Sequence, residues 1–201
     1  AYSQFNFDLS KKIKIQSGIR YEFTDTFVDS PNGEIFIDRD YGNFFPSLFI
    51  SYKINDFNNF NFSYSKRITR PAFTQMAPLA AFLDLNTAIF GNLSLVPSYS
   101  DNIQFDYRFK SLNVSAQYSI EKDIIARFSP TIDAETNFVT FTPNNFDKRK
   151  SFNVIFSYPF NPTNFWNIRF FTTFSSSAIE GSLAEVSIDR RLESARFNIN
   201  N

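Results

Sequence analysis

The sequence predicts an all-β protein, an antiparallel up-and-down meander that crosses a membrane as part of a β-barrel. Three observations carry this prediction. Residues 12–23, KIKIQSGIRYEF, alternate between an apolar and a polar or charged face, as a strand between two different solvents does. Aromatic residues make up 19% of the 201-residue chain, including 28 Phe, yet the mean hydropathy is only −0.25. Finally, short and long connections alternate along the whole chain.

The strands follow one another as segments with a period of two residues. We expect nine of them, at residues 1–9, 12–23, 47–54, 60–68, 103–109, 112–121, 152–160, 166–174 and from 195 onward. Most are 8 to 11 residues long, which is close to the length that a tilted strand needs to cross a bilayer. Soluble strands are typically about 5 to 6 residues long.

One face of each segment is expected to meet lipid and the other a wet or plugged lumen. In the second segment the lumen face carries Lys14, Gln16, Arg20 and Glu22, and Gly18 on that face leaves room for another element to pack closely. The residues expected to face lipid are Ile13, Ile15, Ile19, Tyr21, Phe23, Leu48, Ile50, Tyr52, Phe60, Phe62, Tyr64, Phe105, Tyr107, Val114, Tyr118, Phe156, Tyr158, Trp166, Ile168 and Phe170.

The connections favour a membrane barrel over a sandwich. Short turns near residues 10, 55–59, 110–111 and 161–164 alternate with long connections at 25–44, 69–100, 122–150 and 175–194. The third of these is expected to continue both strands to a hairpin at 133–136. In a meander all short turns then lie at one end, as in barrels with short periplasmic turns and long extracellular loops. Aromatics near strand ends, including Phe165, fit two interfacial girdles, or simply aromatic-rich strands.

Composition excludes several functions. Twenty basic and twenty acidic residues cancel, and nucleic-acid-binding proteins usually show a basic excess. The chain has no Cys and no His, which removes thiolate nucleophiles, His-dependent triads and Cys or His zinc sites. No carboxylate pair has a catalytic spacing. We therefore predict no enzyme activity, no cofactor and no nucleic-acid partner.

Residues 44–110 contain FPSLFISYK at 45–53, FSYSKRITRP at 62–71 and GNLSLVP at 91–97. With these motifs the segment resembles the barrel of Bacteroidota-type TonB-dependent outer-membrane receptors. The family pattern reads approximately FPSLxLSYK, LSYSRRIxRP, LNPF and GNPxLxPE, and GIRYEF at 18–23 is similar to its GxRYE segment. Departures are Leu93 in place of Pro, Ser98 in place of Glu, and Met76-Ala77 in place of Leu-Asn. The matching residues of the main run are Phe45, Pro46, Ser47, Leu48, Ser51, Tyr52, Lys53, Ser63, Tyr64, Ser65, Lys66, Arg67, Ile68, Arg70, Pro71, Pro78, Asp84, Thr87, Gly91, Asn92, Leu95 and Pro97.

The resemblance implies function and partners. Receptors of this family have a barrel of about 22 strands, a periplasmic plug domain and a segment that contacts TonB, so this chain would be a barrel segment only. It would form part of the wall of a transporter for a bulky nutrient such as a siderophore, glycan or peptide, in the bacterial outer membrane. Expected partners are outer-membrane lipid, lipopolysaccharide, the plug, TonB and, as a further candidate, a surface lipoprotein.

Four residues in or beside the long loop are candidates for contact with substrate or plug: Arg67, Arg70, Asp84 and Asn92. Three of the four also have a purely structural interpretation. Arg67 and Arg70 would pair with loop carboxylates or sit in the charged outer rim, Pro71 would shape the loop after Arg70, and Gly91-Asn92 would form a turn. The basic run at 148–150 would contact lipopolysaccharide or be a solvated loop end.

Two other functions remain open at this point. A small stand-alone barrel would present its long loops as an adhesive or structural surface, and it predicts an even-stranded membrane protein of this size. A soluble β-sandwich would bind carbohydrate through exposed aromatics, and it predicts a protein that needs no detergent.

Overall fold

The chain forms one curved antiparallel sheet. A computed structural model describes residues 1–29, 32, 35–163, 166–183 and 186–200. Its elements are β1 (Tyr2–Asp8), β2 (Ile13–Asp29), β3 (Ile35–Lys53), β4 (Asn58–Thr69), α1 (Phe73–Met76), β5 (Ala80–Asp84), β6 (Thr87–Phe90), β7 (Ser98–Phe109), β8 (Leu112–Ile132), β9 (Val139–Thr163), β10 (Trp166–Leu183) and β11 (Val186–Asn200).

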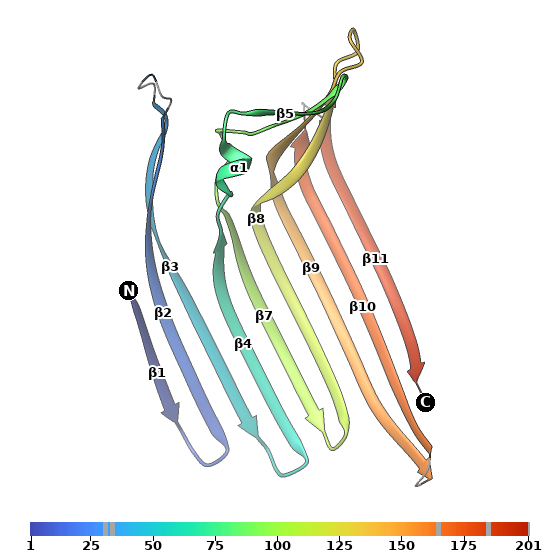
Figure 1. Cartoon of the computed structure of the whole chain (residues 1–201). Helices are drawn as coiled ribbons and strands as arrows, with labels where there is room; N and C mark the ends of the chain where they lie inside the picture. Colours follow the sequence, from blue (N-terminus) through green and yellow to red (C-terminus); the bar gives the residue numbers. More distant parts are fainter. Residues whose placement is uncertain (30–31, 33–34, 164–165, 184–185, 201) are drawn as a thin grey trace.

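Nine strands follow one another in the order β1-β2-β3-β4-β7-β8-β9-β10-β11, each antiparallel to the next. This confirms the predicted meander. The turns after β1, β3 and β7 lie at one end of the sheet, and the connections predicted to be long reach the other end (Figure 1). Most of residues 25–44, 122–150 and 175–194 are strand, so the prediction of long connections there is wrong, and the long connection of the described chain is the one after β4. In the described turns, side chains supply the bonds: Ser10 Oγ accepts from two backbone N–H groups, and so does Asn55 Oδ1. The turn at 164–165 lies outside the described residues, as does Phe165.

The strands are longer than predicted. β8 has 21 residues and β9 has 25, so the prediction of 8 to 11 residues is wrong for most of the sheet. At about 3.3 Å per residue, β8 is roughly 70 Å long and extends well beyond a bilayer. Alternation of apolar and polar residues marks only the part of a strand that separates two solvents, so the extensions carry no such signal. The β8–β9 hairpin predicted at 133–136 is confirmed, since the backbone N–H of Asp133 donates to Phe138 O.

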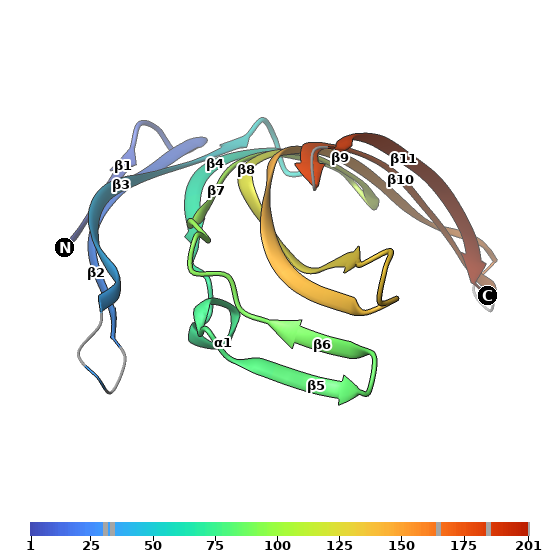
Figure 2. The ribbon, with the colours of Figure 1, turned by 90° about the horizontal axis from the view of Figure 1, so that it is seen from above.

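The connection after β4 is an ordered unit that the sequence did not predict. Residues 70–97, here called the inward loop, contain α1 and a β5–β6 hairpin, and β6 pairs in parallel with β9. Figure 2 shows this unit on the concave side of the arched sheet. A small hydrophobic core holds it there: Met76 and Leu95 of the inward loop pack with Val28 and Ile37 of β2 and β3.

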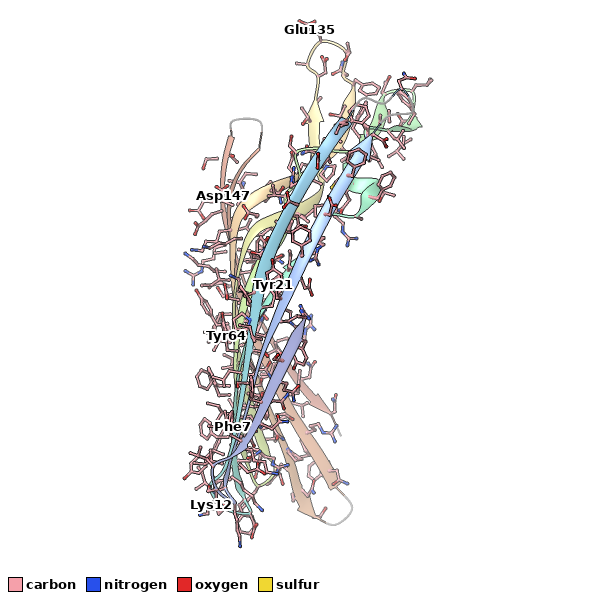
Figure 3. The ribbon with its side chains drawn as sticks, turned by 90° about the vertical axis from the view of Figure 1, so that its left-hand side faces the viewer. Phe7, Lys12, Tyr21, Tyr64, Glu135 and Asp147 are labelled. Carbon is pink, nitrogen blue, oxygen red and sulfur yellow. The ribbon has the colours of Figure 1, made fainter. Side chains whose placement is uncertain are left out.

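The inward loop identifies the two faces of the sheet. Arg70 bonds to Glu22 and Thr24, so these side chains of β2 lie on the concave face, and the odd-numbered residues of β2 lie on the convex face. Strand register extends this assignment across the sheet, for example through the row Ile50, Phe62, Phe105, Ala116 and Val154. Figure 3 shows the labelled Tyr64 on the convex side.

The residues predicted to face lipid share the convex face. Register places them there from β2 to β10, and Trp166 follows by alternation with Ile168 across an irregularity in the β9–β10 ladder. Neighbouring rings also meet, with centroids 4.9 Å apart for Phe62 and Phe105 and 5.0 Å apart for Phe60 and Tyr107. The convex face therefore carries a continuous band of apolar and aromatic side chains.

Candidate functional site

The concave face is a polar wall. One row of directly opposed residues runs Ser47, Ser65, Asn102, Ser119, Ser151 and Ser177 through β3, β4, β7, β8, β9 and β10. Hydroxyls and amides bond along it: Ser119 Oγ donates to Asn102 Oδ1 at 2.9 Å, and the hydroxyls of Ser151 and Ser177 lie 3.4 Å apart. Small side chains with matched donors and acceptors make a hydrated surface that carries little charge.

Gly18 lies on this wall where a side chain would be crowded. A Cβ at Gly18 would stand 2.9 Å from Ser47 Oγ and 3.1 Å from the hydroxyl of Tyr2. The predicted close approach is therefore present, and the approaching groups come from the neighbouring strands β1 and β3.

Arg70 fastens the start of the inward loop to β2. Its Nη2 lies 2.7 Å from Glu22 Oε2 and donates to Thr24 Oγ1 at 2.8 Å, while its Nε donates to Thr24 Oγ1 at 3.0 Å. Glu22 Oε1 pairs with Arg20 Nε at 2.7 Å. One carboxylate thus holds two guanidinium groups from different elements, because each of its oxygens accepts a separate N–H.

Backbone pairing between β3 and β4 covers only seven residue pairs, from Lys53↔Asn59 to Ser47↔Ser65. Pro46 comes next in β3. Proline has no N–H to give to a neighbouring strand, so a ladder readily stops beside it. Above this point no described residue of β3 pairs with β4, and a side-chain bond connects β3 with β7: Asn43 Nδ2 donates to the Tyr99 hydroxyl at 3.0 Å. We call the unpaired region above Ser47 and Ser65 the β3–β4 seam.

Arg67 stands at the seam. In the register of the concave face it opposes Ser100, which opposes Glu121, which opposes Arg149. Glu121 is occupied by an ion pair with Arg149 and by Ser98 Oγ, 2.9 Å from Glu121 Oε1. The side chain of Arg67 has no hydrogen bond or ion pair with another residue in the described part of the chain. The sequence predicted the same candidate roles for Arg67 and Arg70, but the structure gives their side chains different surroundings.

Asn92 anchors the inward loop to β9. Its Nδ2 donates to Pro143 O at 2.9 Å and to Asn144 Oδ1 at 3.2 Å, and its Oδ1 accepts from the N–H of Ser94. A turn begins at Asn92, whose carbonyl accepts the N–H of Leu95 at 3.3 Å. Gly91 packs closely against the start of the inward loop, because a Cβ there would lie 2.0 Å from Ala77 O. Contact of Asn92 with substrate or plug stays a prediction.

Asn145 has a role that sequence reasoning missed. Its side chain bonds to both backbone groups of Val96, accepting from the N–H at 2.9 Å and donating to the carbonyl at 3.0 Å, and it also donates to Asp123 O. An amide can complete a backbone in this way because it carries an acceptor and donors side by side. No local pattern indicates this role, since Val96 is 49 residues away in the chain.

Asp84 lies in the exposed β5–β6 hairpin, where its Oδ1 accepts the N–H of Asn86 at 2.7 Å. The turn explains this contact without a ligand. Among the described residues, no three acidic side chains gather closely enough to hold a metal ion.

No helix in the described ranges is long and apolar enough to span a membrane.

Long antiparallel strands with an apolar convex face and a hydrated concave face define the wall of a transmembrane β-barrel. The sequence model of the Outer membrane protein beta-barrel family matches residues 1–201, so the chain belongs to this family and to the bacterial outer membrane.

Solved structures with the same fold include three outer-membrane receptors and transporters. The siderophore receptor PirA from Pseudomonas aeruginosa matches with a TM-score of 0.62 and 14% identity over 98% of this chain and 36% of that one. A mutant of the ferric enterobactin receptor PfeA from Pseudomonas aeruginosa matches with a TM-score of 0.55 and 13% identity over 92% of this chain and 30% of that one. The FrpB iron transporter from Neisseria meningitidis matches with a TM-score of 0.53 and 11% identity over 96% of this chain and 31% of that one. The chain spans about a third of each of these proteins. A search of curated protein sequences gave no match.

Proposed function

We propose that this chain is part of the barrel wall of a TonB-dependent receptor that imports a bulky nutrient such as a siderophore, glycan or peptide. The observation that carries the proposal is the inward loop. It is fixed across the concave face by Arg70, Asn92 and Asn145, so it narrows the lumen at the end with the long connections. A narrowed lumen agrees with the plugged lumen of 22-stranded outer-membrane transporters, and the solved structures with this fold are receptors and transporters.

The convex face is the proposed lipid surface. In β4 the apolar part lies between Asn58 and Lys66, a rise of about 26 Å along the strand and roughly 20 Å across a membrane after a tilt of about 40°. This is near the height of the apolar band of known barrels, which is about 25 Å.

Lipopolysaccharide is a proposed partner at the upper edge of the same surface. The basic run at 148–150 is divided between the two faces: Arg149 pairs with Glu121 on the concave face, whereas Lys148 and Lys150 lie on the convex face. Lys150 pairs with Glu180 at 3.3 Å. Lysines just above an apolar surface are placed to meet lipid phosphates.

The concave face is the proposed docking wall for the plug and the path of the nutrient. Serine, asparagine and glutamine side chains there can exchange bonds with a moving domain or with water at little cost. TonB would act through the plug, and a surface lipoprotein would sit over the end with the long connections. The Bacteroidota-type assignment remains a prediction.

The test uses the full-length protein that carries this segment. Peptide-mapped mass spectrometry of outer-membrane fractions should give a mass several times 23.3 kDa, with a plug-like region before Ala1. The native host should then grow on iron-loaded siderophores as the sole source of iron, or on glycans or peptides as the sole source of carbon, and this growth should require both this gene and TonB. A mature membrane protein near 23 kDa would support a stand-alone barrel instead, and uptake that persists without TonB would refute the transport mechanism.

A further inference from the structure

The β3–β4 seam contains a cavity of about 580 Å³, within the range of small-molecule sites. Pairing ends below it at Ser47 and Ser65, and the Asn43–Tyr99 bond crosses above it. The cavity is therefore a gap in the ladder that side chains line. Its lining residues are Tyr2, Arg20, Phe45, Pro46, Ser47, Ser65, Lys66, Arg67 and Ile68.

The charge of this lining has one sign. Arg20, Lys66 and Arg67 contribute three cations, and no carboxylate is among the lining residues. Two carboxylates lie beside the lining: Glu22 is shared between Arg20 and Arg70, and Asp101, which opposes Lys66 in the β4–β7 ladder, accepts the hydroxyl of Tyr64 at 2.7 Å. Because the whole chain is neutral, the positive excess here reflects where the charges are placed and not the composition.

The two arginines are available for a ligand. Glu22 uses only the Nε of Arg20, which leaves the terminal nitrogens of that guanidinium. The Arg20 guanidinium lies over the Phe45 ring, with its carbon 5.3 Å from the ring centroid, and Phe45 is buried. Ring and carboxylate together fix the plane of Arg20. Arg67 has no partner among the described residues. Forked guanidinium groups bind the paired oxygens of carboxylates and phosphates.

A second basic cavity, near the tight turns, is less suited to a ligand. It is lined by Lys11, Lys12, Lys14, Lys53 and Arg108, but Asp56 is also present and pairs with Lys53 at 2.8 Å. Lysines on exposed turns provide charge without a fixed donor geometry. The seam cavity offers both.

We propose that the seam cavity binds the carboxylate or phosphate group of an anionic ligand, and that this ligand is a molecule carried along the concave wall. The second clause rests on the proposed transport function. Arg20 and Arg67 grip the anionic oxygens from the two sides of the seam, and the hydroxyls of Ser47 and Ser65 complete the polar lining. Pro46 and Ile68 give the outer part of the cavity an apolar wall.

The test is calorimetric titration of the full-length receptor in detergent with citrate and with inorganic pyrophosphate. We expect Arg67→Gln and Arg20→Gln each to weaken binding at least tenfold. Arg196→Gln is the matched control, because Arg196 lies on the same concave face in β11, away from the seam; it should leave affinity within twofold. Arg67→Lys keeps the charge but loses the fork, so it should fall between wild type and Arg67→Gln and shows that the loss is not one of folding.

Native mass spectrometry separates a lipid source from a free one. If neither probe binds but an outer-membrane phospholipid or lipopolysaccharide is retained by wild type and lost in Arg67→Gln, the anion site is supported and the carried ligand is refuted. If no anion, free or lipid, depends on Arg67, the proposal is overturned. Calorimetric binding needs neither TonB nor energy, so the two proposals can fail separately. If the anion binds but growth does not depend on TonB, the transport function is refuted and the anion site stands. If growth depends on TonB but no anion binds through Arg67, the anion site is refuted and the transport function stands.

Discussion

Replacing Phe62 by arginine tests which solvent the convex face meets. Phe62 lies midway along the apolar part of β4, and its cross-strand neighbours are Ile50 and Phe105. The next residue, Ser63, lies on the concave face between Phe49 and Gln104. The same substitution at these two adjacent positions puts one new charge on each side of the wall, with the same strand and the same backbone.

The expected difference is large. An arginine at the bilayer midplane of a barrel costs about 2 to 4 kcal/mol, and the lost ring contact with Phe105 adds about 0.5 to 1.5 kcal/mol. Phe62→Arg should therefore lower the free energy of unfolding in lipid by about 3 to 5 kcal/mol. Ser63→Arg should lower it by less than about 1 kcal/mol, because the new side chain stays in a hydrated lumen.

The assay is guanidinium unfolding of the full-length protein in phospholipid vesicles, followed by the change in gel mobility between the folded and unfolded forms. Ser63→Arg serves as the matched control for the added charge and size. Equal losses for the two variants, or a larger loss for Ser63→Arg, would refute the assignment of the convex face to lipid. In that case the apolar face would belong to a protein core.

Three further predictions follow from the long-connection end. Gly91→Ala should displace the inward loop, because the new Cβ meets Ala77 O. We expect the loop to lose about 1 to 3 kcal/mol of stability, measured as faster proteolysis of residues 70–97, and an unchanged cleavage rate would contradict the close packing at Gly91. Arg70→Gln removes the ion pair with Glu22 and should speed hydrogen exchange in the same loop, by less than about tenfold because about a third of each side chain is exposed. Slower exchange would refute the role of Arg70 in holding the loop. Hydrogen bonds from the backbone N–H groups of Thr136 and Glu135 hold the pKa of Asp133 below its usual value. Protection of these two amides from hydrogen exchange should therefore be full above about pH 4 and fall as the pH drops through the lower folded pKa. Asp133→Asn should abolish that pH dependence, and protection that does not change with pH in the wild-type β8–β9 hairpin would contradict the prediction.

Sequence reasoning worked where one physical cause acts along each strand. Alternation located all nine strands of the meander and placed the apolar residues on one face, because every crossing strand separates the same two environments. It failed where contacts join distant residues. The anchoring of Val96 by Asn145 and the parallel pairing of β6 with β9 depend on chain segments about 50 residues apart. No periodicity within either segment records such a contact. Arg67 was found, but only because of its place in a motif.

The β3–β4 seam and the inward loop have a common physical origin. Pairing with β4 stops beside Pro46, so above this point the described part of β3 has its backbone ladder with β2 alone. The upper parts of β2 and β3 then need another partner for their concave face, and Met76, Leu95 and Arg70 of the inward loop provide it. A wall paired over its full height would leave neither the cavity nor this docking surface. The break in the ladder therefore costs a few backbone hydrogen bonds, and it places Arg20 and Arg67 in the lining of the cavity.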